Sequence, residues 1–379
     1  MHRKHAELVR PGSGVFHQNE WAFVGAPCAL IESFCVEIAD ALNPFFKIAY
    51  IDADHQAQAE KTPPFPVKIQ DKILFKSIDF QTFKSEFDLR FAANYVSAVF
   101  VNGNHFQAKS QIVFIHDEKR DSLERKLEKI SDPQAFIFTE KGKELYSFLK
   151  EKFPEWEKLP HFNERQIDEV VQFFKNKINE NLPRVNGLVL AGGKSQRMGR
   201  DKGGLVLHEK AQREYTAEML APFCDQVFIS CRKEQVGEFE TGFDLLPDTF
   251  IDLGPFGAIL SAFRANPNAA WLVVACDLPL LQKETLNQLT AGRNPDKVAT
   301  AFRTNAEAFP EPLIAIWEPK AYQILLQFLS KGISCPRKVL INSDIESLIP
   351  PEPEVLTNVN TPEELESVKS RLHDAAPKH

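Results

Sequence analysis

Short apolar runs alternate with amphipathic, helix-length segments along most of the first half of the chain. The runs "EWAFVG" (20–25) and "FKIAYIDAD" (46–54) flank the helical stretch "IESFCVEIADALN" (31–43). Apolar strands separated by a helix in this way are typical of a βαβ unit with a parallel sheet. Further strands are predicted at 95–103, 110–117 and 134–139, and a helix at 163–178, where Ile167, Val170, Val171 and Phe174 recur at helical spacing.

The same alternation restarts after a polar segment at 175–187. Strands are predicted at 185–192, 226–231, 270–277 and 312–317, with helices at 212–223 and 319–332 between and after them. We place the linker at about 180–185. The predicted fold class is α/β, with two Rossmann-like three-layer domains. The predicted organisation is an N-terminal tail (1–14), a first domain (15–180), a second domain (185–370) and a C-terminal tail (371–379).

Length and charge are consistent with this division and narrow the function classes. A chain of 379 residues is long enough for two domains with cores of their own. A formal net charge of −7 argues against a general nucleic-acid-binding protein, and no apolar run approaches the length of a membrane span. The six cysteines are scattered without a CxxC pair, which indicates neither a zinc site nor a disulfide framework. We therefore expect a cytoplasmic protein without nucleic-acid or membrane partners.

The segment "LAGGKSQRMGRDKGG" (190–204) leaves the first predicted strand of the second domain. Ligands of open α/β sheets bind beyond the carboxyl ends of the strands. Gly192 and Gly193 allow backbone N–H groups to approach an anion, and Arg197 and Lys202 add positive charge. This combination predicts a site for a ligand with several phosphates.

Neither of two common phosphate-binding motifs describes this segment. The dinucleotide motif G-x-G-x-x-G fails because Gly192 and Gly193 are adjacent. The P-loop motif G-x-x-x-x-G-K-[ST] fails because Gly193 and Gly199 are one residue too far apart, and because Arg200 and Asp201 follow.

The segment does resemble the signature loop of the molybdenum cofactor guanylyltransferases, through "LAGG", "RMG" and "DK". The resemblance continues through "LLPDTFIDLGPFGAI", "VACDLPLL", "EPLIAIW" and "NVNTPEEL", and covers about residues 185–370. It implies a nucleotidyltransferase fold for the second domain. It also implies Mg²⁺-dependent transfer of GMP from GTP to the phosphate of molybdopterin, which forms molybdopterin guanine dinucleotide and pyrophosphate.

The resemblance also implies roles for individual residues. Arg197, Lys202 and Asp277 would be catalytic, with Asp277 as the ligand of Mg²⁺. This fits the chemistry, because a phosphate monoester is already largely dianionic at pH 7 and the reaction needs cations rather than a strong base. The implied nucleotide contacts are Leu190, Ala191, Gly192, Gly193, Lys202, Ser230, Asp248, Gly254, Pro255, Asp277, Asn358 and Asn360.

Purely structural roles remain open for several of these residues. Asp277 could cap a helix that begins in "LPLLQKETL", and Asp248 could be a turn residue. Asn358 and Asn360 could merely begin the last helix before Pro362.

One position departs from the family pattern. Ser230 stands where the family often has an asparagine, and a hydroxyl cannot replace the paired donor and acceptor of an amide. The related cytidylyltransferases usually carry alanine in place of Gly192, so guanine remains the favoured base.

The first domain resembles the P-loop adaptor protein of the same pathway, through "WAFVGAPCALIESFCVEIADAL", "KIAYIDADH", "AVFVNG" and "LPHFNERQIDEVVQFF". If the P-loop template starts at Gly25, its second glycine, lysine and hydroxyl positions fall on Leu30, Ile31 and Glu32. We therefore predict a degenerate P-loop domain that does not bind nucleotide and instead docks molybdoenzymes or other proteins of the pathway.

Two other function classes stay open at this point. One is a nucleotidyltransferase for another base or acceptor, of the molybdopterin cytidylyltransferase or sugar-phosphate type. The other is a non-catalytic scaffold of the cofactor pathway, which the degenerate first loop favours and the intact second loop disfavours.

Overall fold

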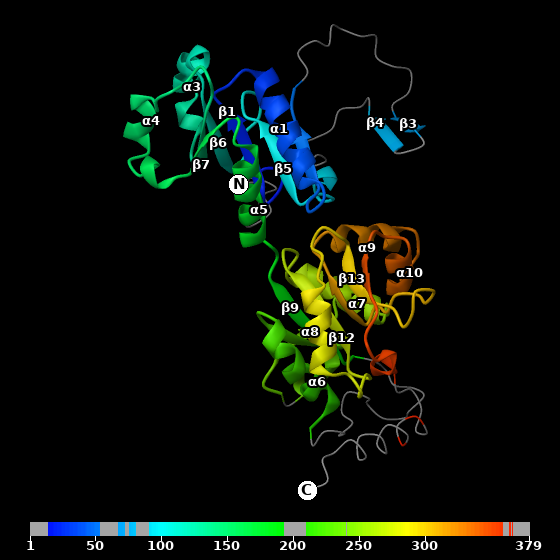
Figure 1. The fold of residues 1–379 in the computed structure, drawn as a ribbon. Coiled ribbons are helices and arrows are strands. Elements are labelled where there is room, and N and C mark those ends of the chain that lie inside the picture. The colour runs from blue at the N-terminus through cyan, green and yellow to red at the C-terminus, as the bar shows by residue number, and fades with distance from the viewer. Residues whose placement is uncertain are drawn as a thin grey trace, which may run out of the picture. The chain divides into compact units, whose positions relative to one another are not determined.

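A computed structural model describes residues 14–53, 67–72, 76–80, 91–192, 210–239 and 241–358, together with Glu364 and Glu366. The chain divides into two units, Met1–Asn181 and Leu182–His379 (Figure 1). The division lies inside the segment 180–185 that the sequence suggests as a linker. Among the described residues, no helix is both long and apolar enough to cross a membrane.

The first unit is built on a parallel sheet with the strand order β2-β5-β1-β6-β7-β8. Its strands are β1 (Glu20–Val24), β2 (Ile48–Ile51), β5 (Ala98–Asn102), β6 (Ser110–Ile115), β7 (Pro133–Phe138) and β8 (His161–Asn163). Strands β2 and β5 lie on one side of β1. The chain then crosses over, and β6, β7 and β8 follow on the other side of β1. Such a reversal brings several strand ends together at one edge beside β1.

Helices cover both faces of this sheet. Trp21 and Phe23 of β1 pack into one core with α1 (Cys28–Leu42) and α5 (Ile167–Glu180), which lie side by side (Figure 1). Ala22 and Val24 point to the opposite core, as successive residues of a strand do. That core includes residues of α3 (Arg120–Arg125) and α4 (Ser147–Lys152). The unit thus has three layers.

A separate antiparallel pair, β3 (Val67–Asp71) and β4 (Lys76–Phe80), was not expected from the sequence. Val67 and Ile69 alternate with polar residues, but these two side chains and that of Ile78 are exposed, and each strand is only five residues long. The unit also contains three short 3-10 helices: η1 (Asp117–Lys119), η2 (Leu127–Lys129) and η3 (Trp156–Lys158).

The second unit is built on a mixed sheet with the strand order β11-β10-β9-β12-β14-β13-β15. Its strands are β9 (Val185–Leu190), β10 (Val227–Cys231), β11 (Asp244–Pro247), β12 (Ala270–Ala275), β13 (Ala299–Phe302), β14 (Ile314–Trp317) and β15 (Glu346–Leu348). Strand β14 runs antiparallel to both β12 and β13, and the other neighbours are parallel.

Two helical layers again enclose the sheet. Leu188, Trp271 and Trp317 share a core with α7 (Pro255–Ala265), α9 (Ala321–Ser330) and α10 (Pro336–Ile341). Val189 and Leu272 face the opposite core with α6 (Gln212–Leu220) and α8 (Lys283–Ala291). The unit also contains the short helices η5 (Ala221–Phe223), η6 (Lys233–Gly237) and η7 (Pro353–Leu356). The predicted α/β class with helices on both faces is confirmed for both units.

Candidate functional site

A pocket opens at the carboxyl edge of the second sheet, where β9, β10 and β12 lie side by side and parallel. Because the ends of adjacent parallel strands meet at one edge, residues far apart in sequence converge there. Its lining comprises Leu190, Ala191, Gly192, Ser230, Asp248, Gly254, Pro255, Ala258, Ala275, Cys276, Asp277 and Leu313.

Most of the residues that the sequence suggests for nucleotide binding meet in this pocket. Among those that the structure describes, all except Asn358 line it. Asn358 follows η7 and lies outside any described helix. The remaining candidates, Gly193, Arg197, Lys202 and Asn360, lie outside the described residues.

Buried Ser230 and half-buried Asp248 form a polar pair on one side of the pocket. The Ser230 hydroxyl, on β10, donates a hydrogen bond of 2.8 Å to Oδ1 of Asp248, which follows β11. The backbone N–H of Asp248 donates to the carbonyl of Cys231 at 2.9 Å. Burial raises the pKa of Asp248 to about 6, although the hydrogen bond from Ser230 works in the opposite direction. Asp248 is therefore an oriented, partly desolvated acceptor and more than a turn residue.

Glycines bring the backbone close to this carboxylate. A β-carbon added to Gly192 would lie 3.6 Å from Asp248 Oδ2 and 3.6 Å from the Arg232 nitrogen. That is ordinary van der Waals contact, so a methyl group fits, but any longer side chain at Gly192 would enter the pocket. Gly254 has φ +56° and ψ −139°, a conformation that L side chains rarely adopt. It directs the N-terminus of α7, beginning at Pro255, toward the pocket, and such a terminus favours anions.

Asp277 lies in the turn after β12 and is half-buried. Helix α8 begins only at Lys283, and Gln282 occupies its N-cap position. The alternative interpretation of Asp277 as the cap of this helix is therefore wrong, because the segment between them forms turns instead of a first helical turn. Asp277 instead lies in the lining of the pocket.

The sequence interpretation missed a second hollow beside the pocket. Arg232, Lys233, Phe250 and Ile251 contribute to it, and it shares Gly192, Asp248 and Gly254 with the first pocket. A local signal existed, since Arg232 and Lys233 directly follow the carboxyl end of β10. Pocket residues such as Leu313 had no such signal, because the antiparallel β14 brings its amino end to this edge.

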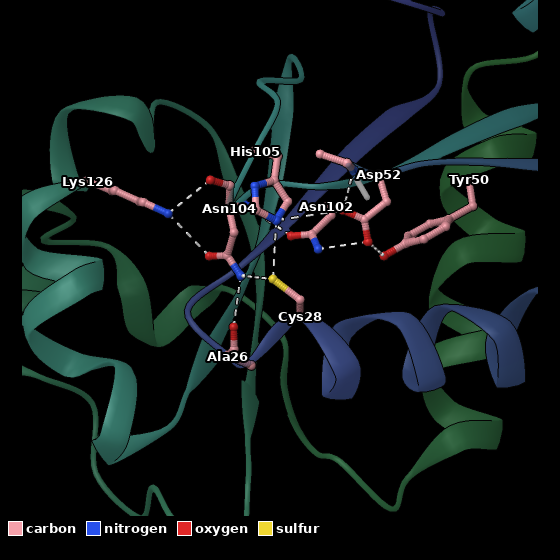
Figure 2. A network of polar contacts seen from close by, with 9 residues as sticks. Ala26, Cys28, Tyr50, Asp52, Asn102, Asn104, His105 and Lys126 are labelled. Atoms are coloured by element: carbon pink, nitrogen blue, oxygen red, sulfur yellow. Dashed lines mark hydrogen bonds and ion pairs between the residues drawn. The ribbon is translucent and has the colours of Figure 1, made fainter. Parts of the chain in front are cut away.

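The first unit has no wrapped phosphate loop at the end of β1. Only residues 25–27 separate β1 from α1, so Leu30, Ile31 and Glu32 already lie inside the helix. Ile31 is fully buried in the core. The Asn104 side chain also donates to the Ala26 carbonyl at 2.9 Å (Figure 2). These contacts support the interpretation of the loop as degenerate.

Comparisons with known proteins agree with the geometry of the second unit. Residues 187–345 match the family model described as a MobA-like NTP transferase domain. A Synechocystis sp. "Molybdenum cofactor biosynthesis bifunctional protein" is 35% identical over 179 residues, which are 47% of this chain and 52% of that protein. This chain thus spans about half the length of that relative. A Shewanella sp. (strain MR-4) "Molybdenum cofactor guanylyltransferase" is 28% identical over 198 residues, 51% of this chain and 98% of that protein.

A solved structure is also similar. The molybdopterin-guanine dinucleotide biosynthesis protein A of Archaeoglobus fulgidus aligns with a TM-score of 0.43 and 24% identity, over 50% of this chain and 99% of its own. The family match begins inside β9 and continues past β14, and so includes the end of every strand that borders the pocket. The second unit of the chain therefore contains a MobA-like NTP transferase domain.

Proposed function

We propose that the second unit transfers GMP from GTP to the phosphate of molybdopterin, forming molybdopterin guanine dinucleotide and releasing pyrophosphate. The observation that carries this proposal is the pocket in which the turn after β9, the Ser230–Asp248 pair, the N-terminus of α7 and Asp277 converge. The names of the curated relatives supply the acceptor and the base.

The reaction depends on positive charge near the phosphates and on the positioning of the two substrates more than on a general base. The attacking phosphate is largely dianionic at pH 7, so the barrier comes from bringing anions together and from the charge on the departing pyrophosphate. In this proposal Arg197 and Lys202, which lie outside the described residues, supply fixed positive charge. The backbone at Gly192 would approach phosphate oxygens, and the dipole of α7, which begins at Pro255 beside the pocket, would favour their negative charge.

The carboxylate of Asp277 fits the role of a magnesium ligand. Carboxylate oxygens suit Mg²⁺, which keeps several water molecules and is often held by one or two carboxylates together with substrate phosphates. Among the described residues there is no group of three or more His, Cys, Asp and Glu that could hold a metal ion. When bound, the ion would neutralise charge on the phosphates.

The Ser230–Asp248 pair favours guanine over cytosine. A carboxylate only accepts hydrogen bonds, and guanine offers two neighbouring N–H groups on its Watson–Crick edge, whereas cytosine offers one amino group. Ser230, which departs from the family pattern, donates to Oδ1 and leaves Oδ2 directed toward Gly192 and the pocket. In this chain the hydroxyl would therefore position the base-binding carboxylate.

One assay separates the alternatives. Full-length protein is incubated with molybdopterin and Mg²⁺, and with either GTP or CTP, and pyrophosphate release and the dinucleotide product are both measured. Product with GTP and little with CTP supports the proposal. Turnover with CTP only would assign a cytidylyltransferase. Release of no pyrophosphate from either nucleotide by folded protein would leave the scaffold function.

For the first unit we propose a docking role, with molybdoenzymes or other proteins of the cofactor pathway as partners and a cytoplasmic setting for the whole reaction. The absence of a wrapped phosphate loop at β1 supports a unit that does not itself use nucleotide. Co-purification of residues 1–181 with a molybdoenzyme from cell extract would test this role.

A further inference from the structure

The carboxyl edge of the first sheet carries a cluster of reactive side chains that the proposed function does not use. Cys28 begins α1, Asp52 follows β2, and Asn104 and His105 follow β5 (Figure 2). The strands that precede these residues are adjacent in the sheet, with β5 between β1 and β2. The cluster occupies the edge at which α/β sheets bind ligands, where the wrapped phosphate loop is missing.

The central contact joins a thiol to an imidazole. Cys28 Sγ lies 3.3 Å from His105 Nε2, although the two residues are 77 positions apart in sequence. A nucleophile within hydrogen-bond reach of a base, with a third group beside the base, is the arrangement that activates cysteines in enzymes. Cys28 is also the first residue of a 15-residue helix, whose N-terminus stabilises a negative sulfur. Both Cys28 and His105 are partly exposed, so a small reagent can reach them.

Asp52 supports the charged form of His105. Its Oδ1 lies 3.8 Å from Nε2 of His105. Burial works against ionisation of Asp52, but hydrogen bonds from Asn102, Tyr50 and the Ala53 N–H, together with the charge of His105, hold the pKa of this carboxyl below its ordinary value. An ionised Asp52 beside Nε2 favours the imidazolium that forms when the ring takes a proton from the thiol.

Asn104 contacts the sulfur from the other side. Its Nδ2 lies 3.6 Å from Cys28 Sγ, and Lys126 Nζ donates to the Asn104 carbonyl at 3.1 Å and to its Oδ1 at 3.4 Å (Figure 2). The Asn104 amide is thereby held with its N–H groups toward Ala26 and Cys28. A thiolate at Cys28 would thus have an N–H donor and a nearby cation in addition to His105.

The geometry suits attack on sulfur better than acyl transfer. The same His105 nitrogen faces both the thiol and Asp52, whereas in hydrolytic triads the carboxylate holds the opposite ring nitrogen. The N–H groups of Leu30 and Ile31 are bonded to the Pro27 carbonyl and do not form an oxyanion hole beside the sulfur. Disulfide exchange needs only a thiolate, access and a proton for the leaving thiol.

We propose that Cys28 is a nucleophilic thiol that exchanges with small disulfides, with His105 as its base. His105 Nε2 takes the thiol proton, and the thiolate attacks one sulfur of the small disulfide. The bond between Cys28 Sγ and that sulfur forms as the original S–S bond breaks. The departing thiolate takes the proton back from His105. The Cys28 thiol is oxidised to a mixed disulfide and the other half of the small disulfide is reduced to a thiol, so no further reactant is needed.

An alkylation experiment on the reduced full-length chain tests the nucleophile. The protein reacts with iodoacetamide at neutral pH, and peptide mass spectrometry follows each cysteine. Cys335 is the internal control, because it is exposed whereas Cys28 is only partly so. We expect Cys28 to react at least about tenfold faster than Cys335, and His105→Gln to remove this advantage. A faster Cys335 in the wild-type chain would overturn the proposal, whether or not the variant folds. So would an unchanged Cys28 rate in folded His105→Gln.

Exchange itself is tested with oxidised glutathione as the probe. A mixed disulfide should form at Cys28 before any other cysteine, be released by a reductant, and be absent from Cys28→Ser. A Cys28 that alkylates rapidly but forms no mixed disulfide would refute the exchange chemistry. Neither outcome depends on the nucleotidyl transfer proposed for the second unit.

Discussion

The Asp277 carboxylate, at the end of β12, gives the most direct test of catalysis at a single residue. Asp277→Asn keeps the size of the side chain and removes its charge, so product formation should fall on the order of a hundredfold while the melting temperature changes little. Asp225→Asn is the matched control, because Asp225 precedes β10 and pairs with Arg184 at the other edge of the sheet. Near-normal turnover of folded Asp277→Asn would assign Asp277 a purely structural role.

Gly192 tests whether the backbone approaches the nucleotide. Leucine at this position should leave the domain folded, because the first side-chain carbon meets only ordinary contacts, but its branches would occupy the pocket beside Asp248. We expect GTP affinity, measured by titration calorimetry, to weaken about tenfold or more. Gly237→Leu is the control, since no atom lies within 4 Å of its added β-carbon. Unchanged affinity for Gly192→Leu would refute the backbone contact.

The raised pKa of Asp248 predicts a pH dependence of stability. Burial moves this pKa from 3.8 to about 6, so between these values the folded state holds a proton that the unfolded state has lost. Stability therefore falls as pH rises through this window, because ionisation is disfavoured in the folded state. Asp248→Asn has no group to ionise at this position. The free energy of unfolding of the variant, measured by urea denaturation, should therefore rise relative to that of the wild type from about pH 4 to pH 7. Ser230→Ala should raise the pKa of Asp248 further, because the Ser230 hydroxyl opposes the effect of burial. The fall in stability should then continue to higher pH. A difference between Asp248→Asn and wild type that stays constant with pH would contradict the shift.

At the scale of elements, the start of α7 depends on the backbone of Gly254. No atom lies within 4 Å of a β-carbon added there, so the effect of Gly254→Ala comes from the φ of +56° alone. We expect a loss of about 1–3 kcal/mol in the free energy of unfolding, and weaker GTP binding because the helix N-terminus shifts from the pocket. Gly242→Ala has equal space and no positive φ, and should change stability by less than about 0.5 kcal/mol. Equal losses in the two variants would show that the Gly254 conformation is not what positions α7.

The loop between β1 and α1 is the corresponding element of the first unit. Its three residues leave no length for a backbone cradle, and the positions where the P-loop motif has its second glycine and its lysine, Leu30 and Ile31, continue the helix. Replacing Ile31 by lysine would therefore not restore nucleotide binding, because the side chain would begin in the core and not at the sheet edge.

At the scale of the whole molecule, the two units should act as separate folding and binding bodies. Each has its own sheet and its own pair of cores. Expressed alone, residues 1–181 should fold without binding GTP, and residues 182–379 should bind GTP in the presence of Mg²⁺, both followed by titration calorimetry. Micromolar binding by the first unit would overturn its assignment as nucleotide-incompetent. A folded second unit without binding would require contacts supplied by the first.

The sequence by itself determined the class of both units and the edge at which the site lies. Apolar runs such as 20–25 and 270–277 predict strands, because a strand that is buried on both faces is apolar at nearly every position. The motifs around Gly192, Asp248 and Asp277 point to one pocket because each directly follows a strand or borders a helix start, and adjacent parallel strands end at one edge.

Only the tertiary structure decided which side chains meet and how. Strand β14 runs antiparallel to β12, and α8 begins only at Lys283. Both depend on strand pairing and packing across the sheet, which cannot be predicted from a local sequence pattern. The Ser230–Asp248 hydrogen bond and the Cys28–His105 contact join residues 18 and 77 positions apart. Hydrophobic periodicity reports burial, and burial alone does not say which polar groups share a strand edge. That information exists only once the strand order places β10 beside β11 and β5 beside β1.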